Sequence, residues 1–466
     1  MINLFSLFKK TIFLNVLVNL KFLIGITSQL ILVRYISPSE FGKFAIIIIL
    51  SEILFSINIV DQTAMIRYQT EKFILKTSLV LCNYGANIIL IISSSVCIFL
   101  YVFEKIDLII LTSSLIILFS RWLKYRLIVV EGILEQKLEY QKIYLNYFYN
   151  SLFSNIFCIY FAYLGFGIYA LILREILEAL IYWFLIRKSK PKPNGEFDKK
   201  TANLVYKFAL QGSLISFLNI FQFKGILLFL GAFANLSIVG FFERAHFLNF
   251  ACSNFFSQLI DRVFVPLVGN KKDGDDNKNT LLNIFLLYKI YVFLPVGITT
   301  FFFGEYICMF LLGNEWKFTG EIISILSVWL IFTNLNYTLE RWIFIHHTRK
   351  YSIIGSIITL LILAMFSINV YFTKEWITLI WGLNIGSIVF FIILMSIIFK
   401  RNDRIKFSTL SYPILFSILG IIFYNNFFIL DWWIMIIVFF FFYFLCTLIV
   451  YFQNIKNFIK NTKIKI

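Results

Sequence analysis

The chain has 466 residues, of which 60% are hydrophobic and only 14% are charged. Soluble globular domains carry about 25% charged residues, so this composition excludes a soluble protein and predicts a polytopic membrane protein. The formal net charge of +17 is typical of a membrane protein whose cytoplasmic loops collect Lys and Arg. The loops are too short to fold into a nucleic-acid-binding module, so we expect no nucleic-acid partner.

Apolar stretches long enough to cross a bilayer follow one another along the whole chain. A transmembrane helix needs about 20 mostly apolar residues, and the connections between these stretches are short. The sequence therefore predicts an all-α polytopic membrane protein with about 14 transmembrane helices. The predicted spans are 12–33, 44–66, 77–101, 108–130, 143–164, 168–186, 203–231, 237–259, 281–312, 321–345, 351–372, 376–399, 408–430 and 432–452.

Two glycines divide one of these stretches. No charged residue interrupts Ile143–Leu173, which is too long for a single span. Gly165 and Gly167 break its helical pattern, so we predict a tight turn over Leu164–Ile168 between two helices.

The distribution of Lys and Arg predicts the orientation. With the N-terminus inside, basic residues gather on the cytoplasmic side, as the positive-inside rule requires. Both termini and the polar linker 187–200 are then cytoplasmic, and we expect a multi-pass protein of the bacterial cytoplasmic (inner) membrane. The outside loops hold five basic residues, namely Arg34, Lys43, Lys105, Lys317 and Lys374.

The linker near the middle predicts two similar halves. We expect an N-lobe of helices 1–6 over 1–186, a cytoplasmic linker over 187–202 and a C-lobe of helices 7–12 over 203–400. Helices 13 and 14 and a basic cytoplasmic tail occupy 401–466. Gly42 and Gly240 stand in similar contexts before spans two and eight. Because both halves start inside, they would be parallel repeats around a central cavity.

Four motifs resemble one family, in order and spacing. Val33–Ala45 resembles the first outside loop of bacterial polysaccharide repeat-unit flippases, and Leu164–Leu171 resembles their turn between spans five and six. Val239–Ala245 is similar to their start of span eight, and Pro266 with Leu267 to a Phe-Pro step after it. The chain departs from the family at Asp61-Gln62-Thr63, where a glycine is common.

The resemblance implies the multidrug/oligosaccharidyl-lipid/polysaccharide exporter superfamily. Its members have two six-helix lobes in a V shape and no ATPase domain, and lipid-flipping members often add two C-terminal helices. The polysaccharide branch, which includes O-antigen flippases, moves undecaprenyl-pyrophosphate-linked oligosaccharides to the outer leaflet. A polysaccharide polymerase and a chain-length regulator are the implied protein partners, beside membrane lipids.

Three basic residues inside spans are candidates for the substrate path: Lys21, Lys224 and Arg244. A charge near the bilayer centre costs about 2.5–3.5 kcal/mol, so it normally faces a cavity or a partner. Positive charge would compensate the desolvation of a pyrophosphate. The alternative is that Lys224 and Arg244, near an outside end, reach the membrane surface.

Other charges within spans have different expected roles. Arg174 is predicted to pair with Glu178 on the same helix, four residues on. Lys289 is predicted to lie at the inner end of span nine. Glu52 and Asp61 are candidates for coupling to a proton or sodium gradient.

The sequence contains no phosphate-cradling loop and no catalytic constellation, so we expect no enzyme activity, cofactor or metal. Two alternatives remain open. One is a drug or cation exporter of the same superfamily, and the other is a membrane polysaccharide polymerase or ligase. The longest outside loop, Arg34–Lys43, is short for the acceptor site that a polymerase presents.

The orientation is testable by cysteine labelling. Ser189→Cys, in the cytoplasmic linker, should be protected from an impermeant thiol reagent in intact cells. Thr319→Cys, before span ten, should react. Labelling of Ser189→Cys in intact cells would contradict the predicted topology.

Overall fold

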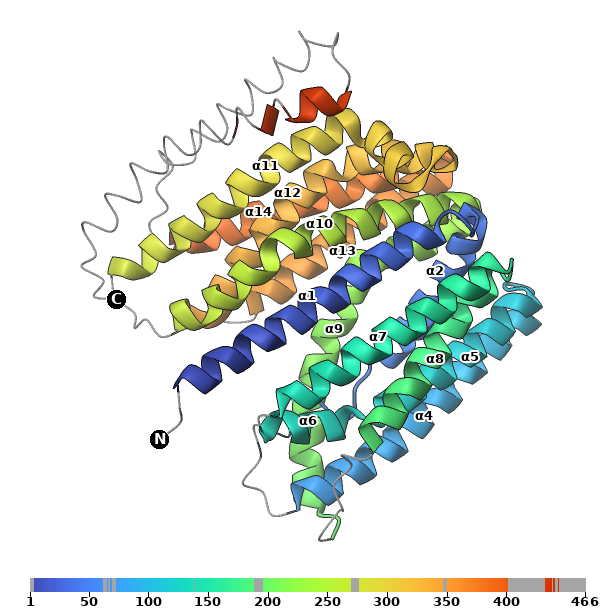
Figure 1. Ribbon diagram of the computed structural model, residues 1–466, viewed down its shortest axis with the longest axis vertical. Coiled ribbons are helices and arrows are strands. Elements are labelled where there is room, and N and C mark those ends of the chain that lie inside the picture. The colour runs from blue at the N-terminus through green and yellow to red at the C-terminus, as the bar shows by residue number, and fades with distance from the viewer. Residues whose placement is uncertain are drawn as a thin grey trace. The chain divides into compact units, whose positions relative to one another are not determined.

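The structure is a computed structural model that describes residues 4–61, 73–137, 139–187, 196–269, 276–346 and 350–400, with residues 65 and 68 and most of 432–443. Within these ranges the long elements are all helices (Figure 1). The predicted all-α polytopic membrane fold is confirmed. Predicted helices 13 and 14 and the basic tail lie almost entirely outside the described residues, so the number fourteen stays a prediction.

Each of the first twelve predicted spans overlaps a helix. The helices are α1 (Leu4–Leu32), α2 (Pro38–Phe55), α4 (Ile74–Val102), α5 (Leu108–Tyr125), α6 (Ile128–Gln136), α7 (Tyr140–Tyr163), α8 (Ile168–Ile186), α9 (Lys199–Phe233), α10 (Leu236–Gly269), α11 (Asp276–Leu312), α12 (Lys317–His346), α13 (Lys350–Thr373) and α14 (Ile377–Lys400).

Six helical segments are long and apolar enough to cross a membrane by length and composition, among the described residues. They are 74–102, 108–136, 281–312, 314–343, 353–373 and 377–399. The 19 residues of α8, which is not among them, include one Arg and two Glu, and these charges form part of the site described below.

The second predicted span, 44–66, is wrong at both ends, because α2 begins at Pro38 and stops at Phe55. Beyond Phe55 the backbone takes partners outside its own helix. The N–H groups of Asn58 and Ile59 donate to a serine hydroxyl on α9 and a tyrosine hydroxyl on α5, each at 2.7 Å. Tertiary hydrogen bonds therefore replace the helical ones that the apolar sequence suggested.

The predicted turn over Leu164–Ile168 is confirmed, since α7 ends at Tyr163 and α8 begins at Ile168. Gly165 and Gly167 both have positive φ, of 83° and 51°. This backbone region disfavours residues with a Cβ.

Glu40, in the first turn of α2, fastens this α7–α8 turn to the loop before α2. Its Oε1 accepts a hydrogen bond from the N–H of Ile168 at 3.2 Å. Its Oε2 accepts from the backbone N–H and the hydroxyl of Ser37 at 3.0 and 2.9 Å, which completes a capping box. A Cβ on Gly167 would overlap the Glu40 carboxylate.

Gly42 and Gly240, the two glycines of the predicted repeat, lie against each other. A Cβ on Gly42 would overlap the carbonyl oxygen of Leu236, and a Cβ on Gly240 would overlap that of Pro38. The starts of α2 and α10 therefore touch backbone to backbone, as glycines allow at helix crossings in membranes. Three of the four family-like motifs thus meet in one junction.

The chain forms two compact units, Met1–Glu243 and Arg244–Ile466. α9 follows the predicted linker but packs against α2 and α4 of the first unit. Asp198 caps α9 by accepting from the hydroxyl and the N–H of Thr201 at 2.6 and 2.9 Å, and these bonds lower the pKa of the Asp198 carboxyl. The predicted lobes 1–186 and 203–400 and their repeat axis stay a prediction.

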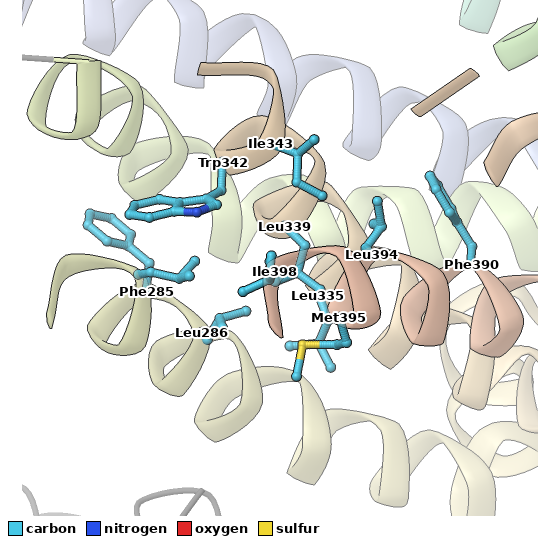
Figure 2. Close-up of a cluster of buried hydrophobic side chains, with 11 residues drawn as sticks. Phe285, Leu286, Leu335, Leu339, Trp342, Ile343, Phe390, Leu394, Met395 and Ile398 are labelled. Atoms are coloured by element: carbon cyan, nitrogen blue, oxygen red, sulfur yellow. The ribbon is translucent and has the colours of Figure 1, made fainter. Parts of the chain in front are cut away.

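The second unit is built on an apolar core between α11, α12 and α14. Figure 2 shows large side chains of the three helices pointing toward one another. Thr319, in the first turn of α12, is buried. The exposed Glu315, in the short 3-10 helix before α12, is therefore the better position for the outside cysteine label. The core comprises Leu282, Phe285, Leu286, Leu335, Leu339, Trp342, Ile343, Phe390, Leu394, Met395 and Ile398.

The close approach at Gly42 predicts a stability difference between two glycines. Gly42→Ala should lower the thermal unfolding midpoint in detergent, because overpacking costs about 1–3 kcal/mol. Gly25→Ala is the matched control, since a Cβ on Gly25 meets nothing within 4 Å. It should leave the midpoint unchanged or raise it, as alanine favours a helix. Equal unfolding midpoints for the two variants would contradict the close contact between the starts of α2 and α10.

Candidate functional site

A polar cavity of roughly 300 Å³ lies in the first unit. α5, α6, α7 and α8 supply most of its lining, and both acidic and basic side chains reach it. The lining residues are Phe55, Asn58, Arg121, Lys124, Tyr125, Ile128, Glu131, Tyr147, Asn150, Glu178 and Tyr182. A charged cavity within a bundle of apolar helices is the feature that marks a functional site in a membrane protein.

Opposite charges on α5 and α8 form ion pairs beside this cavity. Arg121 and Lys124 are three residues apart on α5, and Glu175 and Glu178 are three residues apart on α8, so each pair shares a helix face. The Lys124 Nζ lies 3.2 Å from Glu178 and 3.7 Å from Glu175. The two helices pack together, and their ion pairs satisfy charges that would otherwise be buried alone.

The predicted pair between Arg174 and Glu178 is wrong about the partner. The guanidinium of Arg174 lies 3.1 Å from Glu175 instead and stands 5.8 Å from the ring of Phe44. Glu178 turns toward Lys124 on α5. The helix spacing allowed an intrahelical pair, but an adjacent helix supplied a second cation that the spacing could not reveal.

Two sequence candidates, Glu52 and Lys224, form one ion pair. The Glu52 carboxylate accepts from Lys224 Nζ at 2.6 Å through one oxygen and from Arg121 at 3.3 Å through the other. Glu52 therefore joins α2 to α5 and α9. The structure makes Glu52 the counter-ion of two cations and leaves its predicted part in coupling untested.

Two buried polar atoms of the cavity lining have no hydrogen-bond partner within the described part of the chain. They are the Nε–H of Arg121 and the Oδ1 of Asn150. Buried polar groups are nearly always satisfied in native proteins, so this donor and this acceptor each call for a partner outside the described residues, such as a water molecule or a ligand. A phosphate oxygen can accept from the Nε–H but cannot donate to the Oδ1, whereas a sugar hydroxyl can do either.

Glu131, on α6, is held by tyrosines. The hydroxyls of Tyr147 and Tyr182 both donate to its Oε1, the former at 3.0 Å. The two rings stack with centroids 5.2 Å apart. Lys21, on α1, places its Nζ 4.6 Å from the centre of the Tyr147 ring. This path candidate thus lies beside the cavity, next to Glu131.

The remaining predicted residues lie elsewhere. Asp61 lies past the end of α2, where its carboxylate abuts Gly212 of α9, and it does not line the cavity. Arg244 belongs to the second unit, is 4% exposed and stands 5.0 Å from the ring of Phe247. The structure therefore brings Lys21 and Lys224 to one charged cluster in the first unit, and the predicted part of Arg244 in the substrate path stays a prediction.

Lys289, on α11, is fully enclosed by protein, and its predicted place at the inner end of span nine stays a prediction. Its Nζ lies 2.5 Å from the hydroxyl of Ser257, which contacts Asn334 at 3.1 Å. Lys289 is thus a buried cation of the second unit, in polar company that the apolar sequence around it does not reveal.

Comparison with known families matches residues 31–320 to the polysaccharide biosynthesis proteins. The chain belongs to this family. The resemblance carried by the four motifs is thereby confirmed. No curated protein matches the chain.

Solved structures show the fold of this polysaccharide biosynthesis protein. The lipid II flippase MurJ, in an inward closed conformation, is similar at a TM-score of 0.76 and 16% identity, over 95% of this chain and 100% of that one. A mutant of the Vibrio cholerae MATE transporter VcmN is similar at 0.55 and 12% identity, over 85% and 98%. An inward-facing multidrug resistance MATE transporter of the MOP superfamily is similar at 0.53 and 15%, over 83% and 96%.

Sequence reasoning missed Arg121, Lys124, Glu131 and Glu175 as parts of the site. The first two lie in the second half of predicted span four, toward the side where basic residues are expected. The missed signal was complementarity, because two cations three residues apart in one span matched two acids three residues apart in another. Only the contact between α5 and α8 shows that the two pairs meet.

The Glu52 pairing predicts a loss of stability. Glu52→Gln should lower the free energy of unfolding by about 1–3 kcal/mol, because two partly buried cations lose their counter-ion. A double-mutant cycle with Lys224→Met should return a favourable coupling energy. The matched control is Glu139→Gln, whose ion pair with Lys142 is exposed and should contribute nothing measurable. Equal effects of the two Gln variants would contradict a structural role for Glu52.

Proposed function

We propose that this protein is a flippase that moves undecaprenyl-pyrophosphate-linked oligosaccharide repeat units across the bacterial cytoplasmic membrane. The product would enter surface polysaccharide, such as O-antigen or capsule. The observation that carries the proposal is the cavity with Arg121 and Lys124 in its wall, inside a polytopic member of the polysaccharide biosynthesis family. The MurJ-like fold supports it.

The cavity chemistry suits an anionic head group attached to sugars. A pyrophosphate loses much of its hydration when it leaves water, and fixed cations compensate this cost. The guanidinium of Arg121, in the cavity wall, is the kind of group that binds phosphate through paired N–H donors. Tyr125, Tyr147 and Asn150 provide further polar atoms, which are suited to sugar hydroxyls.

The acids of the cluster hold the cations before substrate arrives. Glu52 positions Arg121 and Lys224, while Glu175 and Glu178 position Lys124. An incoming phosphate can then pair with these cations beside the carboxylates or in their place. In the empty state, the carboxylates leave no cation of the cluster isolated. Such exchange avoids the desolvation cost of an unpaired charge.

The alternative functions fit less well. A drug or cation exporter of the same superfamily would present its cationic substrates to Arg121 and Lys124, which would repel them. A polymerase or ligase would require catalytic groups, and we propose no chemical step for this chain. A polymerase and a chain-length regulator are instead its expected partners on the outer face. Transport is expected to need no cofactor and to draw on a proton or sodium gradient, for which Glu52 and Asp61 remain candidates.

Complementation of a deletion strain tests the proposal. Lys21→Met and Arg121→Met should each reduce surface polysaccharide about tenfold or more at matched expression, because a charge-assisted phosphate contact is worth about 1.5–3 kcal/mol. Lipid-linked repeat units should accumulate in the cytoplasmic leaflet. The same assay on Lys224→Ala and Arg244→Ala, alone and combined with Lys21→Ala, measures how much the other two path candidates contribute to polysaccharide export.

Lys105→Met is the control for loss of a positive charge, because Lys105 is exposed in the α4–α5 loop. It should export polysaccharide at the parental rate. Full export by the Lys21/Arg121 double variant would refute the electrostatic mechanism. Normal lipid-linked intermediates in the deletion strain, combined with increased drug sensitivity, would favour the exporter.

A further inference from the structure

The acids around the cavity are held in two different ways. Glu52, Glu175 and Glu178 each have a cation within ion-pair distance. Glu131 is bound by two tyrosine hydroxyls on one oxygen, and it has no ion pair with any residue in the described part of the chain. Protonation of a carboxylate paired to a buried cation would leave that cation without a counter-ion, which is costly.

A carboxyl held by hydroxyls is free of that cost. In the ionised state Oε1 accepts from Tyr147 and Tyr182. In the protonated state the carbonyl oxygen still accepts from both, and the new O–H becomes a donor toward the cavity. Both charge states of Glu131 therefore keep their hydrogen bonds within the same side-chain arrangement.

Charged and titratable groups face Glu131 from several helices. Lys21 of α1 attracts its ionised form, and Glu135, one turn along α6, repels it. Lys124 of α5 and Glu178 of α8 line the same cavity and pair with each other. Tyr147 of α7 and Tyr182 of α8 are the direct donors.

The charge state of Glu131 changes the net charge of the cluster. Protonation of Glu131 removes one negative charge from the cluster and so raises its net positive charge by one unit. The cations are Lys21, Arg121, Lys124, Arg174 and Lys224, and the acids are Glu52, Glu131, Glu175 and Glu178.

We propose that Glu131 is a proton-binding residue of the cavity and that its protonation strengthens the binding of an anionic head group. Proton and anion then bind with positive linkage, and each raises the affinity of the other by the same factor. One unit of charge about 10 Å away, at an effective dielectric constant of about 20, changes a binding constant on the order of tenfold. This inference rests on the proposed function, because it requires the cavity to take an anion.

The test measures affinity against pH in nanodiscs. The probe is a water-soluble P1,P2-diester of pyrophosphate carrying a short prenyl chain and one hexose, whose two negative charges stay constant over the range. From pH 8 to pH 5.5 the parental protein should bind the probe about tenfold more tightly. Glu131→Gln, which fixes a neutral side chain of the same shape, should bind tightly at every pH. Proton uptake on probe addition in weak buffer should occur in the parental protein and vanish in Glu131→Gln.

Two variants keep the test specific. Glu178→Gln removes a cation-paired acid and should retain the pH dependence, because Glu131 is still present. Tyr147→Phe removes one bond to the ionised form and should move the midpoint of the dependence to higher pH; this variant also serves if Glu131→Gln unfolds. A slope that persists unchanged in both Glu131→Gln and Tyr147→Phe overturns the role of Glu131 and leaves the flippase proposal standing. Absence of probe binding at every pH, by every folded variant, overturns the flippase proposal itself.

Discussion

A charge inside the hydrocarbon needs a partner, and this constraint organises the first unit. Apart from Arg174 with Glu175, which are both on α8, the ion pairs around the cavity join different helices and are therefore also helix contacts. Lys124 with Glu178 joins α5 to α8, and Glu52 with Arg121 and Lys224 joins α2 to α5 and α9. Association of helices in lipid gains little from hydrophobic burial. Polar pairs therefore help specify which helices are neighbours, and in doing so they place cations around a cavity.

The family-like motifs answer a different need. Glu40 binds the α7–α8 turn, and Gly42 lies against Gly240 at the start of α10. These residues bring helix ends together with short side chains, positive φ and one capping carboxylate. None of them lines the cavity. The motifs thus identify the fold, while residues outside the motifs give the cavity its chemistry, which fits the general separation of fold from site.

The two ways of holding an acid suggest a division of work in the cavity. Cation-paired acids such as Glu52 hold the cations of the site in place. Glu131, bound by Tyr147 and Tyr182, is the carboxyl whose charge can change at the least cost in buried electrostatics. The second unit contains a buried cation of another kind, because Lys289 is enclosed with the hydroxyl of Ser257. Residues of the same type, which the sequence does not distinguish, thus have different partners in the structure.

The sequence by itself determined the fold class, the positions of the first twelve helices and the turn at Leu164–Ile168, since length and apolarity in a bilayer leave little choice. It also placed Lys21, Lys224 and Glu52 among the residues of interest, because isolated charges in spans are rare. Tertiary structure decided the pairing. Side chains from other helices decide that α2 ends at Phe55, that Glu178 pairs with Lys124 and that Arg121 pairs with Glu52. Neither helical periodicity nor composition records which helices are neighbours.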